Sequence, residues 1–565
     1  MFYFPKKSNS TLIAGGCDIK WRLRYHQISE NNDIAKNTKH KESLAMAMGI
    51  EFSKRVRNAE VLKKFVQPEE IIPYFKDGMI LGFSGFIEGH PKMTGAILAD
   101  YVEKNGLQGQ LGFTILSGAS IGLDIDDRWA SMRMIKRRFP FQMTKELNRQ
   151  VNVGEIQFAD QHLSRYAQEI ANGFYTLDND GKIDIAVVEA SAITEDGGIV
   201  PTLSGGALPE ILSRAEKVIV EINTFMPSFE GLHDFVPVHN PPHNQPLQIT
   251  AVEQRVGTGY VPCDPGKIVA IIESDKHPLG REIPPPNEAS IAIGAPFIEF
   301  LKHEVKMGRL AESLLPLQFG GGHISNAVFV GLAKEFSDFK IWTEVITDGF
   351  LDAIDKGKVD AITCTGLCFS TPGMKRLLAN FEQYTKQITI RQASVSNGAE
   401  MIRRLGLICV NTPAEIDIYA HVNSSMINGS RIMNGVGGSG DFMRNAYLSV
   451  MLSPSTSSTP TDPTGISRVL PMLAHVDHTE HEMHLIGTEQ GIADLRGLVP
   501  REKAQLIIDN CAHPDYRPIL QDYFDRATHE CKAKGAMHQP HMLHKAFKMQ
   551  KNLEEHGTMK IDNWD

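Results

Sequence analysis

The sequence lacks several features that would point to particular classes of protein. Its 565 residues contain no apolar run near the roughly 20 residues that cross a bilayer, so we expect no membrane partner. Basic residues are not in excess. With 58 Lys and Arg against 67 Asp and Glu, the formal net charge is −9, which argues against nucleic acid as the main partner.

Cysteine is scarce and irregularly placed. There are seven cysteines, an odd number without the spacing of a disulfide framework. Cys364 and Cys368 lie four positions apart instead of forming a CxxC pair. This distribution is typical of a reducing compartment.

Residues 1–45 are polar and somewhat basic, unlike the rest of the chain. They contain no apolar segment after the basic residues, which argues against a signal peptide. Asp18, Glu30 and Asp33 count against a mitochondrial presequence. We therefore expect a cytoplasmic protein, with a mitochondrial location as the alternative if residues 1–45 act as a presequence.

The length and the periodicity indicate more than one α/β domain. Short β-branched runs alternate with helical stretches, which predicts mostly parallel sheets covered by helices. The runs are at 79–86, 111–118, 183–190, 217–222, 267–272 and 406–410. We predict a polar N-terminal extension (1–45), an N-terminal α/β domain (46–245), a C-terminal α/β domain (246–530) and a polar tail (531–565) that forms a peripheral helix. The Ser/Thr/Pro-rich stretch 453–464 is interpreted as a surface loop.

Residues 434–447 carry four glycines within six positions, followed by Asp441 at the predicted start of a helix. Bare backbone before a helix N-terminus suits an oxyanion or a phosphate. The spacing Gly435-x-Gly437-x-x-Gly440 also fits the dinucleotide fingerprint. Residues 428–434, however, do not have the pattern of a buried strand, so we favour an amide-lined anion pocket over a nucleotide site.

Glu344 has two interpretations. In the first, Thr343 caps a following helix and Glu344 lies in its first turn, facing the positive end of the dipole. In the second, Glu344 is a reactive carboxylate beside a glycine-rich pocket. The triplet Gly320-Gly321-Gly322 would bring bare backbone close to a ligand in such a pocket.

Two polar segments near the C-terminus also have two interpretations each. His475, His478, His481 and His484 recur every three residues without Cys or HExxH, so we predict a polar turn near the active site and no metal. The segment 488–497 is either a solvated turn with a local Asp–Arg pair or the source of a second carboxylate that positions substrate or changes the pKa of the first.

Taken together, the motifs resemble the acetyl-CoA hydrolase/transferase family, which includes succinyl-CoA:acetate CoA-transferases and proteins called acetyl-CoA hydrolases. The resemblance extends from about residue 55 to about residue 520. Five ordered segments carry it in the C-terminal half: 411–419, 437–442, 475–481, 488–497 and 510–518. Three shorter ones carry it in the N-terminal half: 82–86, 117–120 and 127–129.

The resemblance implies a class I CoA-transferase fold, two tandem α/β domains with the active site between them. It implies that Glu344, in the Thr-Glu-Val segment, is the nucleophile, and that backbone amides near Gly438 and Gly321 form the oxyanion hole. Family members often carry a lysine just before Ile466-Ser467, which this chain lacks. If that lysine binds CoA, either another cation replaces it here or the affinity for CoA is lower. The remaining implied substrate- or CoA-binding residues are Gly320, Gly322, Asn397, Gly437, Gly440 and Glu489.

The expected activity is that of an acyl-CoA:carboxylate CoA-transferase, using acetyl-CoA or succinyl-CoA with acetate or a similar short carboxylate. The alternative is an acetyl-CoA hydrolase. More distant alternatives are an NAD-dependent oxidoreductase and a CoA-binding regulatory protein without catalysis. We expect CoA as a substrate, no permanently bound cofactor, and a homodimer.

Overall fold

The computed structural model describes residues 50–282 and 284–565, and it contains two large, mostly parallel sheets. The predicted α/β class is thus confirmed. In the first sheet every pairing along the main path is parallel, and only β6 (Ile199–Pro201) joins β5 antiparallel. The order is β4 (Gln157–Phe158), β3 (Ile135–Phe139), β2 (Phe113–Leu116), β1 (Ile80–Phe83), β5 (Ile183–Ile193), β7 (Ala215–Asn223) and β8 (Ile268–Ser274).

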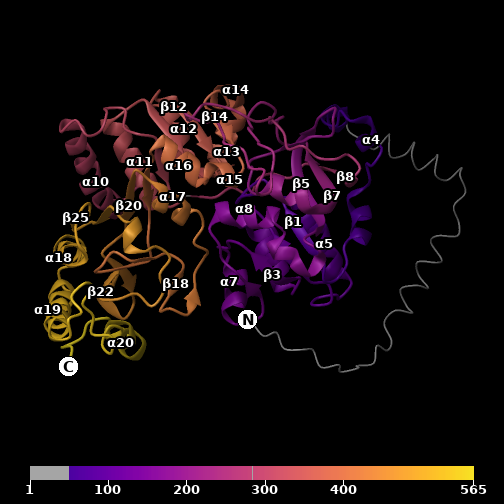
Figure 1. Cartoon of the computed structure of the whole chain (residues 1–565). Coiled ribbons are helices and arrows are strands. Elements are labelled where there is room, and N and C mark those ends of the chain that lie inside the picture. Colours follow the sequence, from indigo (N-terminus) through magenta and orange to yellow (C-terminus); the bar gives the residue numbers. More distant parts are fainter. Residues whose placement is uncertain (1–49, 283) are drawn as a thin grey trace, which may run out of the picture. The chain divides into compact units, whose positions relative to one another are not determined.

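The second sheet is parallel except at one edge, where β24 and β25 form an antiparallel pair. Its order is β14 (Ile388–Ile390), β12 (Val359–Cys364), β10 (Phe339–Trp342), β9 (Leu317–Phe319), β15 (Ile408–Asn411), β20 (Leu448–Leu452), β24 (Leu485–Thr488) and β25 (Gly491–Asp494). Figure 1 shows the strands of the first sheet in indigo to magenta and most of those of the second in orange to yellow. We call residues 50–282 the N-terminal half and residues 284–565 the C-terminal half.

Helices connect the strands in both halves, as right-handed crossovers between parallel strands require. The N-terminal half contains α3 (Ile50–Arg55), α4 (Ala59–Leu62), α5 (Lys92–Lys104), α6 (Arg128–Ser131), α7 (Lys145–Asn152), α8 (Leu163–Ala171) and α9 (Leu208–Arg214). The C-terminal half contains α10 (Glu288–Lys306), α11 (His323–Glu335), α12 (Asp348–Asp355), α13 (Thr371–Ala379), α14 (Phe381–Tyr384), α15 (Ala393–Ser396), α16 (Ala399–Leu405), α17 (Ser439–Asn445), α18 (Pro500–Cys511), α19 (Arg517–Ala533) and α20 (Lys548–His556). None of these helices is long and apolar enough to cross a membrane.

Strand β8 lies beyond the boundary that we placed at residues 245–246, yet it pairs with β7 in the first sheet. The predicted boundary therefore separates the last strand of this sheet from the other strands. The other predicted domain limits stay predictions. Residues 224–267, which contain the predicted boundary, connect β7 to β8 and so return to the same sheet. Residues 1–45 lie outside the described residues.

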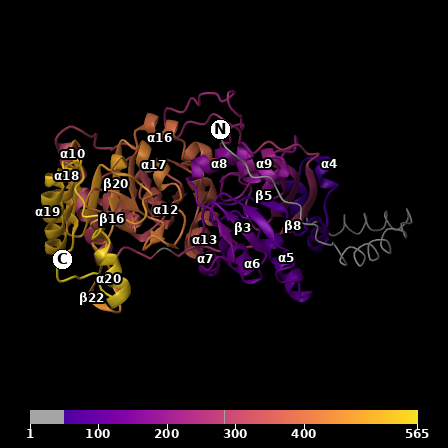
Figure 2. The same ribbon diagram turned by 60° about the horizontal axis from the view of Figure 1, so that its bottom comes forward.

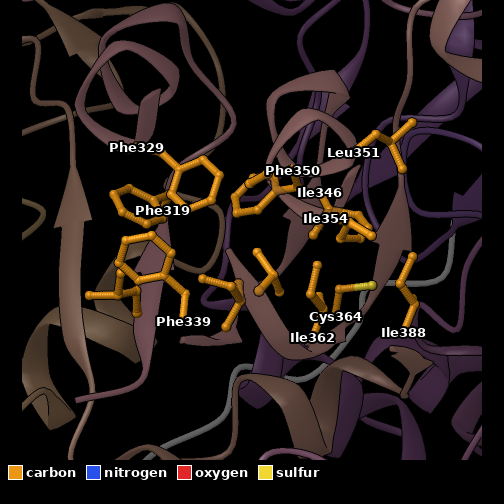
Figure 3. Packing of buried hydrophobic residues seen from close by; sticks show 14 of the residues in the cluster. Phe319, Phe329, Phe339, Ile346, Phe350, Leu351, Ile354, Ile362, Cys364 and Ile388 are labelled. Carbon is orange, nitrogen blue, oxygen red and sulfur yellow. The ribbon is translucent and has the colours of Figure 1, made fainter. Parts of the chain in front are cut away.

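An aromatic cluster fills the space between the second sheet and two helices that cover it (Figure 3). The rings of Phe329 on α11 and Phe350 on α12 stack with centroids 4.4 Å apart. Phe319 at the end of β9 packs against Phe329 with centroids 5.4 Å apart. Such pairs contribute about 0.5–1.5 kcal/mol each beyond area burial. The cluster therefore fixes the carboxyl end of β9, after which the glycine triplet begins.

The prediction of a surface loop at 453–464 is wrong for most of that segment. The structure has a hairpin there, formed by β21 (Thr456–Thr459) and β22 (Asp462–Ser467). The tail carries the predicted helix, α20, but it also buries apolar side chains. Trp564 is 1% exposed and its indole N–H donates to Ile519 O at 2.9 Å. Helices α18, α19 and α20 gather in one region in both ribbon views (Figures 1 and 2).

Candidate active site

A cavity of about 460 Å³ opens at the carboxyl ends of β9, β10 and β15. In proteins with open parallel sheets, ligands bind beyond the carboxyl ends of the strands, where the loops that follow the strands come together. The N-terminal half contributes an apolar wall, and the C-terminal half contributes Glu344 and two glycine-rich segments. The apolar wall consists of Phe86, Ile87, Ala119, Phe141, Met143 and Leu163.

Glu344 lies in a bend between β10 and the short strand β11 (Val345–Ile346). Helix α12 starts four residues later, at Asp348, so the interpretation of Thr343 and Glu344 as a helix start is wrong. Thr343 instead donates its hydroxyl to Phe319 O at 2.9 Å, which ties the end of β10 to β9. The Glu344 carbonyl accepts from Thr365 N at 2.8 Å and Gly366 N at 3.0 Å. The backbone of Glu344 is therefore held on both sides.

The side chain of Glu344 is held by Asn397. The Asn397 amide donates to Glu344 Oε1 at 2.5 Å, and its oxygen accepts from the Ser396 hydroxyl at 2.8 Å. Trp342 in turn donates its indole N–H to Ser396 O at 2.6 Å. The family resemblance implied a substrate- or CoA-binding role for Asn397, and the structure places this residue against the predicted nucleophile.

Burial raises the pKa of the Glu344 carboxyl to about 7, and the negative charge of Asp441 adds to this rise. The hydrogen bond from Asn397 acts in the opposite direction because it favours the ionised form. A carboxylate with a raised pKa in a partly dry pocket is a stronger nucleophile than one in water.

Gly438 is the residue before α17, and it lies against the Glu344–Asn397 pair. A Cβ at this position would be 1.8 Å from Glu344 Oε1 and 2.2 Å from Asn397 Nδ2. Only glycine therefore allows the carboxylate to approach this backbone. Helix α17 begins at Ser439 with Asp441 in its first turn, as the sequence predicted. Gly437, with φ +62°, also lines the cavity.

The triplet Gly320-Gly321-Gly322 joins β9 to α11 and lines the cavity at all three positions. A Cβ on Gly320 would be 2.8 Å from Asn411 Oδ1, so this residue is packed. A Cβ on Gly321 or Gly322 would meet nothing within 4 Å. The open space beside Gly321 leaves its backbone free to face a ligand. The structure thus brings both predicted glycine segments to the cavity that holds Glu344.

Asn397 contacts Glu344 without lining the cavity, and two other predicted residues also lie outside the lining. Glu489, in the turn between β24 and β25, accepts from Ser455 N at 2.9 Å and from the Ser455 hydroxyl. Gly440 is buried inside α17, where a Cβ would be 2.2 Å from His162 Cε1. Their predicted roles toward substrate stay predictions. The local pair expected in segment 488–497 is present, with Arg496 Nη2 2.7 Å from Asp494 Oδ2.

Sequence reasoning missed two arginines that line the cavity. Arg468 follows β22 and donates from Nε to Ser457 Oγ at 2.7 Å and from Nη1 to Pro413 O at 2.9 Å. Arg281, before α10, has its Nη1 3.6 Å from Met143 Sδ. Arg468 lies two residues after Ile466, close to the position of the missing lysine, and that proximity was the available signal.

The histidine quartet forms a polar turn, with the 3-10 helix η4 (Glu480–Glu482) between His478 and His484. His478 is fully buried, with Nε2 3.1 Å from Ser439 Oγ and Nδ1 3.3 Å from Glu482 Oε2. The turn thus packs on α17, next to the cavity. Across residues 50–282 and 284–565, no three His, Cys, Asp or Glu side chains are arranged to hold a metal ion.

The glycine fingerprint 435–440 does not follow a buried strand. The strand before it, β19 (Arg431–Ile432), is two residues long and forms a small antiparallel hairpin with β18 (Met426–Ile427). A dinucleotide site needs a parallel βαβ unit at this point. The segment lies against Glu344 instead, and the anion-pocket interpretation stays a prediction.

Comparison with known proteins agrees with this geometry. The models of the acetyl-CoA hydrolase/transferase N-terminal and C-terminal domains match residues 50–273 and 373–524. An acetyl-CoA hydrolase of Schizosaccharomyces pombe is 50% identical over 516 residues, covering 91% of this chain and 99% of that protein. The chain belongs to the acetyl-CoA hydrolase/transferase family. It is therefore an enzyme of this family, as the motifs predicted.

Solved structures confirm the predicted fold of this family member. RipA from Yersinia pestis superposes with a TM-score of 0.64 at 20% identity, covering 85% of this chain and 99% of RipA. A 4-hydroxybutyrate CoA-transferase from Porphyromonas gingivalis superposes with a TM-score of 0.55 at 20% identity, covering 84% of this chain and 98% of that one. At such identities the likeness shows the CoA-transferase fold and nothing about substrate.

Proposed function

We propose that this family member is an acyl-CoA:carboxylate CoA-transferase that uses acetyl-CoA or succinyl-CoA and works through a glutamyl-CoA thioester on Glu344. The observation that supports it best is the Glu344 carboxylate, held by Asn397 at 2.5 Å in a cavity bordered by two glycine segments. A positioned carboxylate next to bare backbone amides is the equipment that covalent exchange of thioesters requires.

In the proposed reaction, an oxygen of Glu344 bonds to the thioester carbonyl carbon. The oxyanion accepts hydrogen bonds from amides near Gly438 and Gly321. The carbon–sulfur bond of this tetrahedral adduct then breaks, which releases CoA as the thiolate and leaves an acyl-glutamyl anhydride on Glu344. The thiolate attacks the glutamyl carbonyl, which forms the glutamyl-CoA thioester and releases the first carboxylate. A second carboxylate reverses these steps and leaves as acyl-CoA.

A second candidate is hydrolysis of acetyl-CoA, favoured by the similarity to the acetyl-CoA hydrolase of Schizosaccharomyces pombe. Water would then replace the acceptor carboxylate at the anhydride or at the glutamyl-CoA thioester. Both candidates need the same nucleophile. They differ in how well the apolar wall keeps water from the covalent intermediate.

The mechanism is tested by trapping the intermediate. The protein is incubated with acetyl-CoA, reduced with borohydride and mapped by peptide mass spectrometry. We expect reduction of a thioester to an alcohol, with a fixed mass loss, at Glu344 alone. Addition of acetate or succinate before borohydride should remove the signal. Consumption of acetyl-CoA without any modified glutamate would contradict the covalent mechanism.

Transfer and hydrolysis are separated by following free thiol. With succinyl-CoA and labelled acetate, a transferase forms labelled acetyl-CoA and releases almost no free CoA. A hydrolase releases one thiol for each thioester consumed, whether or not acetate is present. The second result would replace transfer by hydrolysis as the activity of this chain.

We expect the activity to fall on the acid side of pH 7. The pKa of Glu344 is raised to about 7 by burial, and only the ionised carboxylate attacks the thioester. The value of kcat/KM should therefore drop about tenfold for each pH unit below 7 and level off above it. A pH profile measured between 5 and 9 checks this. An acid limb centred near pH 4.5 would show that the nucleophile is not this buried group.

Arg468 is expected to bind CoA from the hairpin wall of the cavity. A charge-assisted hydrogen bond to a phosphate or carbonyl of CoA contributes about 1.5–3 kcal/mol. Arg468→Gln should therefore raise KM for acetyl-CoA by about 10- to 100-fold with little change in kcat. The matched control is Arg526→Gln, a half-exposed arginine on α19 paired with Asp522. Equal KM values for the two variants would exclude Arg468 from the CoA site.

A further inference from the structure

The segment 431–441, which carries the glycines beside Glu344, is held from the N-terminal half by side chains. Asn152 of α7 accepts from Ile432 N at 3.0 Å and donates to Ile432 O at 2.9 Å. Further along, Asp160 Oδ2 accepts from Val436 N at 2.5 Å. Gly435 permits this approach, because a Cβ there would lie 2.5 Å from Asp160 Oδ1. The active-site loop of one half is thus fixed by polar residues of the other.

A third contact in this seam is of a different kind, because it leads on to the nucleophile. Asp441 in the first turn of α17 accepts from the Ser164 hydroxyl at 2.6 Å and from Ser164 N at 3.0 Å. The same carboxylate accepts from Asn397 Nδ2 at 3.4 Å. Asn397 Nδ2 also donates to Glu344 Oε1 at 2.5 Å. An unbroken path of side-chain contacts therefore joins α8 of the N-terminal half to Glu344.

The path is shielded from solvent for most of its length. Asn397 is 0% exposed and Asp441 is 8% exposed. Buried polar contacts of this kind keep fixed geometry because leaving them unpaired is costly. A shift of Ser164 relative to α17 would therefore displace Asp441 and the Asn397 amide, because these groups are shielded from water that could replace the lost hydrogen bonds.

Given the role proposed above for Glu344, we propose that Ser164 and Asp441 are positioning residues. Ser164 fixes the position of the Asp441 carboxylate, and Asp441 fixes the orientation of the Asn397 amide. Asn397 in turn orients the Glu344 carboxylate. The reactive geometry is therefore complete only when α8 is seated against α17. The three hydrogen bonds to Asp441 couple closure of the two halves to the orientation of the nucleophile.

Charged and titratable groups around this path are few. His162, two residues before Ser164, faces Asp441 with a pKa lowered by burial. Arg444, His478 and Glu482 surround His162 in turn. Burial raises the pKa of Asp441, while the bonds from Ser164 oppose that rise. Removing the Asp441 charge should move the acid limb of the activity to lower pH, because that charge adds to the raised pKa of Glu344.

The test compares variants of the full-length protein. Ser164→Ala removes the 2.6 Å bond and should lower kcat about tenfold, with KM for acetyl-CoA changed less than about twofold. Ser164→Thr keeps the hydroxyl and should restore most of kcat. Asp441→Asn should lower kcat by about 10- to 100-fold and shift the acid limb of kcat/KM to lower pH.

The matched control is Arg404→Ala on α16, which removes the hydrogen bonds to Leu247 O at 2.7 Å and Ile249 O at 3.2 Å between the two halves but, among the described residues, no hydrogen bond to segment 431–441 or to Glu344. It should lower Tm while kcat stays within about twofold. If Ser164→Ala and Asp441→Asn match this control in kcat and acid limb, the residues only hold the fold together and the proposal is wrong. Glu344→Ala tests the proposed function separately. If that variant keeps full activity, the proposed function is wrong, whatever the results for the Ser164 and Asp441 variants are. Should Asp441→Asn not fold, the Ser164→Ala and Ser164→Thr pair decides the question.

Discussion

Glu344→Gln should lower kcat by at least about 10³-fold, because an amide oxygen cannot form the glutamyl anhydride on which the proposed exchange depends. The amide keeps the size of the side chain and accepts the bond that Asn397 donates at 2.5 Å. KM for acetyl-CoA should therefore change little, since the rest of the cavity is intact. Initial rates with acetyl-CoA and labelled acetate measure the loss. Residual activity within tenfold of the wild type would end the nucleophile assignment.

The same substitution should make the protein more stable above pH 7. Burial raises the pKa of Glu344 to about 7 in the folded state, against about 4.3 for an unfolded chain. Stability from such a group is present below its unfolded pKa and is lost as pH rises through 7. Because Glu344 borders the cavity, we expect the loss to be about 2 kcal/mol. Thermal unfolding at pH 5 and pH 8 should show the gain in Tm for Glu344→Gln mainly at pH 8.

Gly438→Ala is expected to have the second largest effect. The new Cβ would lie 1.8 Å from Glu344 Oε1 and 2.2 Å from Asn397 Nδ2, so the carboxylate and its amide partner must both move. Displacing the proposed nucleophile and the neighbouring proposed oxyanion donor should reduce kcat by about 10²- to 10³-fold. The backbone of Gly438, with φ −93° and ψ 1°, tolerates alanine, so the loss should come without unfolding.

Gly259→Ala is the control for this variant, because its Cβ would meet no atom closer than 3.7 Å and the residue lies outside the cavity lining. It should keep wild-type kcat and Tm. A Gly438→Ala protein with normal kcat would mean that Glu344 moves freely in the working enzyme. If circular dichroism shows that the Gly438→Ala protein has lost its fold, the clash is relieved by displacement of the whole helix α17 and not by Glu344 and Asn397 alone.

The parts of the site that the sequence indicated are carried by contiguous motifs. Glu344, Gly438 and the triplet at 320–322 lie in short segments whose residue types predict bare backbone or a reactive carboxylate, and the structure brings these segments to one cavity. Glu344 and the triplet meet because β9 and β10 are neighbours and their carboxyl ends share one edge, while Gly438 lies in the connection between β15 and β20. Asn397 was implied by the family resemblance alone. The α/β class followed from buried β-branched runs that alternate with helices.

The parts that sequence missed depend on contacts between distant residues. Ser164 is 277 positions from Asp441, and nothing local marks that serine as different from others on a helix. Hairpin 456–467 has Ser and Thr in place of apolar alternation, so its composition resembles a loop, while cross-strand pairs such as Thr456 with Ser467 hold it. The boundary predicted at 245–246 lies in the connection between β7 and β8, and a long connection can leave a sheet and return to it.

The cavity has consequences for how the enzyme becomes active after synthesis. Its walls come from positions as far apart as Phe86, after β1 of the first sheet, and Arg468, after the hairpin strand β22. Contacts of such long sequence separation form late in folding. During refolding from denaturant, helical circular dichroism should therefore recover before catalytic turnover does. A chain with complete secondary structure but halves not yet docked would be an inactive species with an exposed apolar wall, which is the form most prone to aggregate.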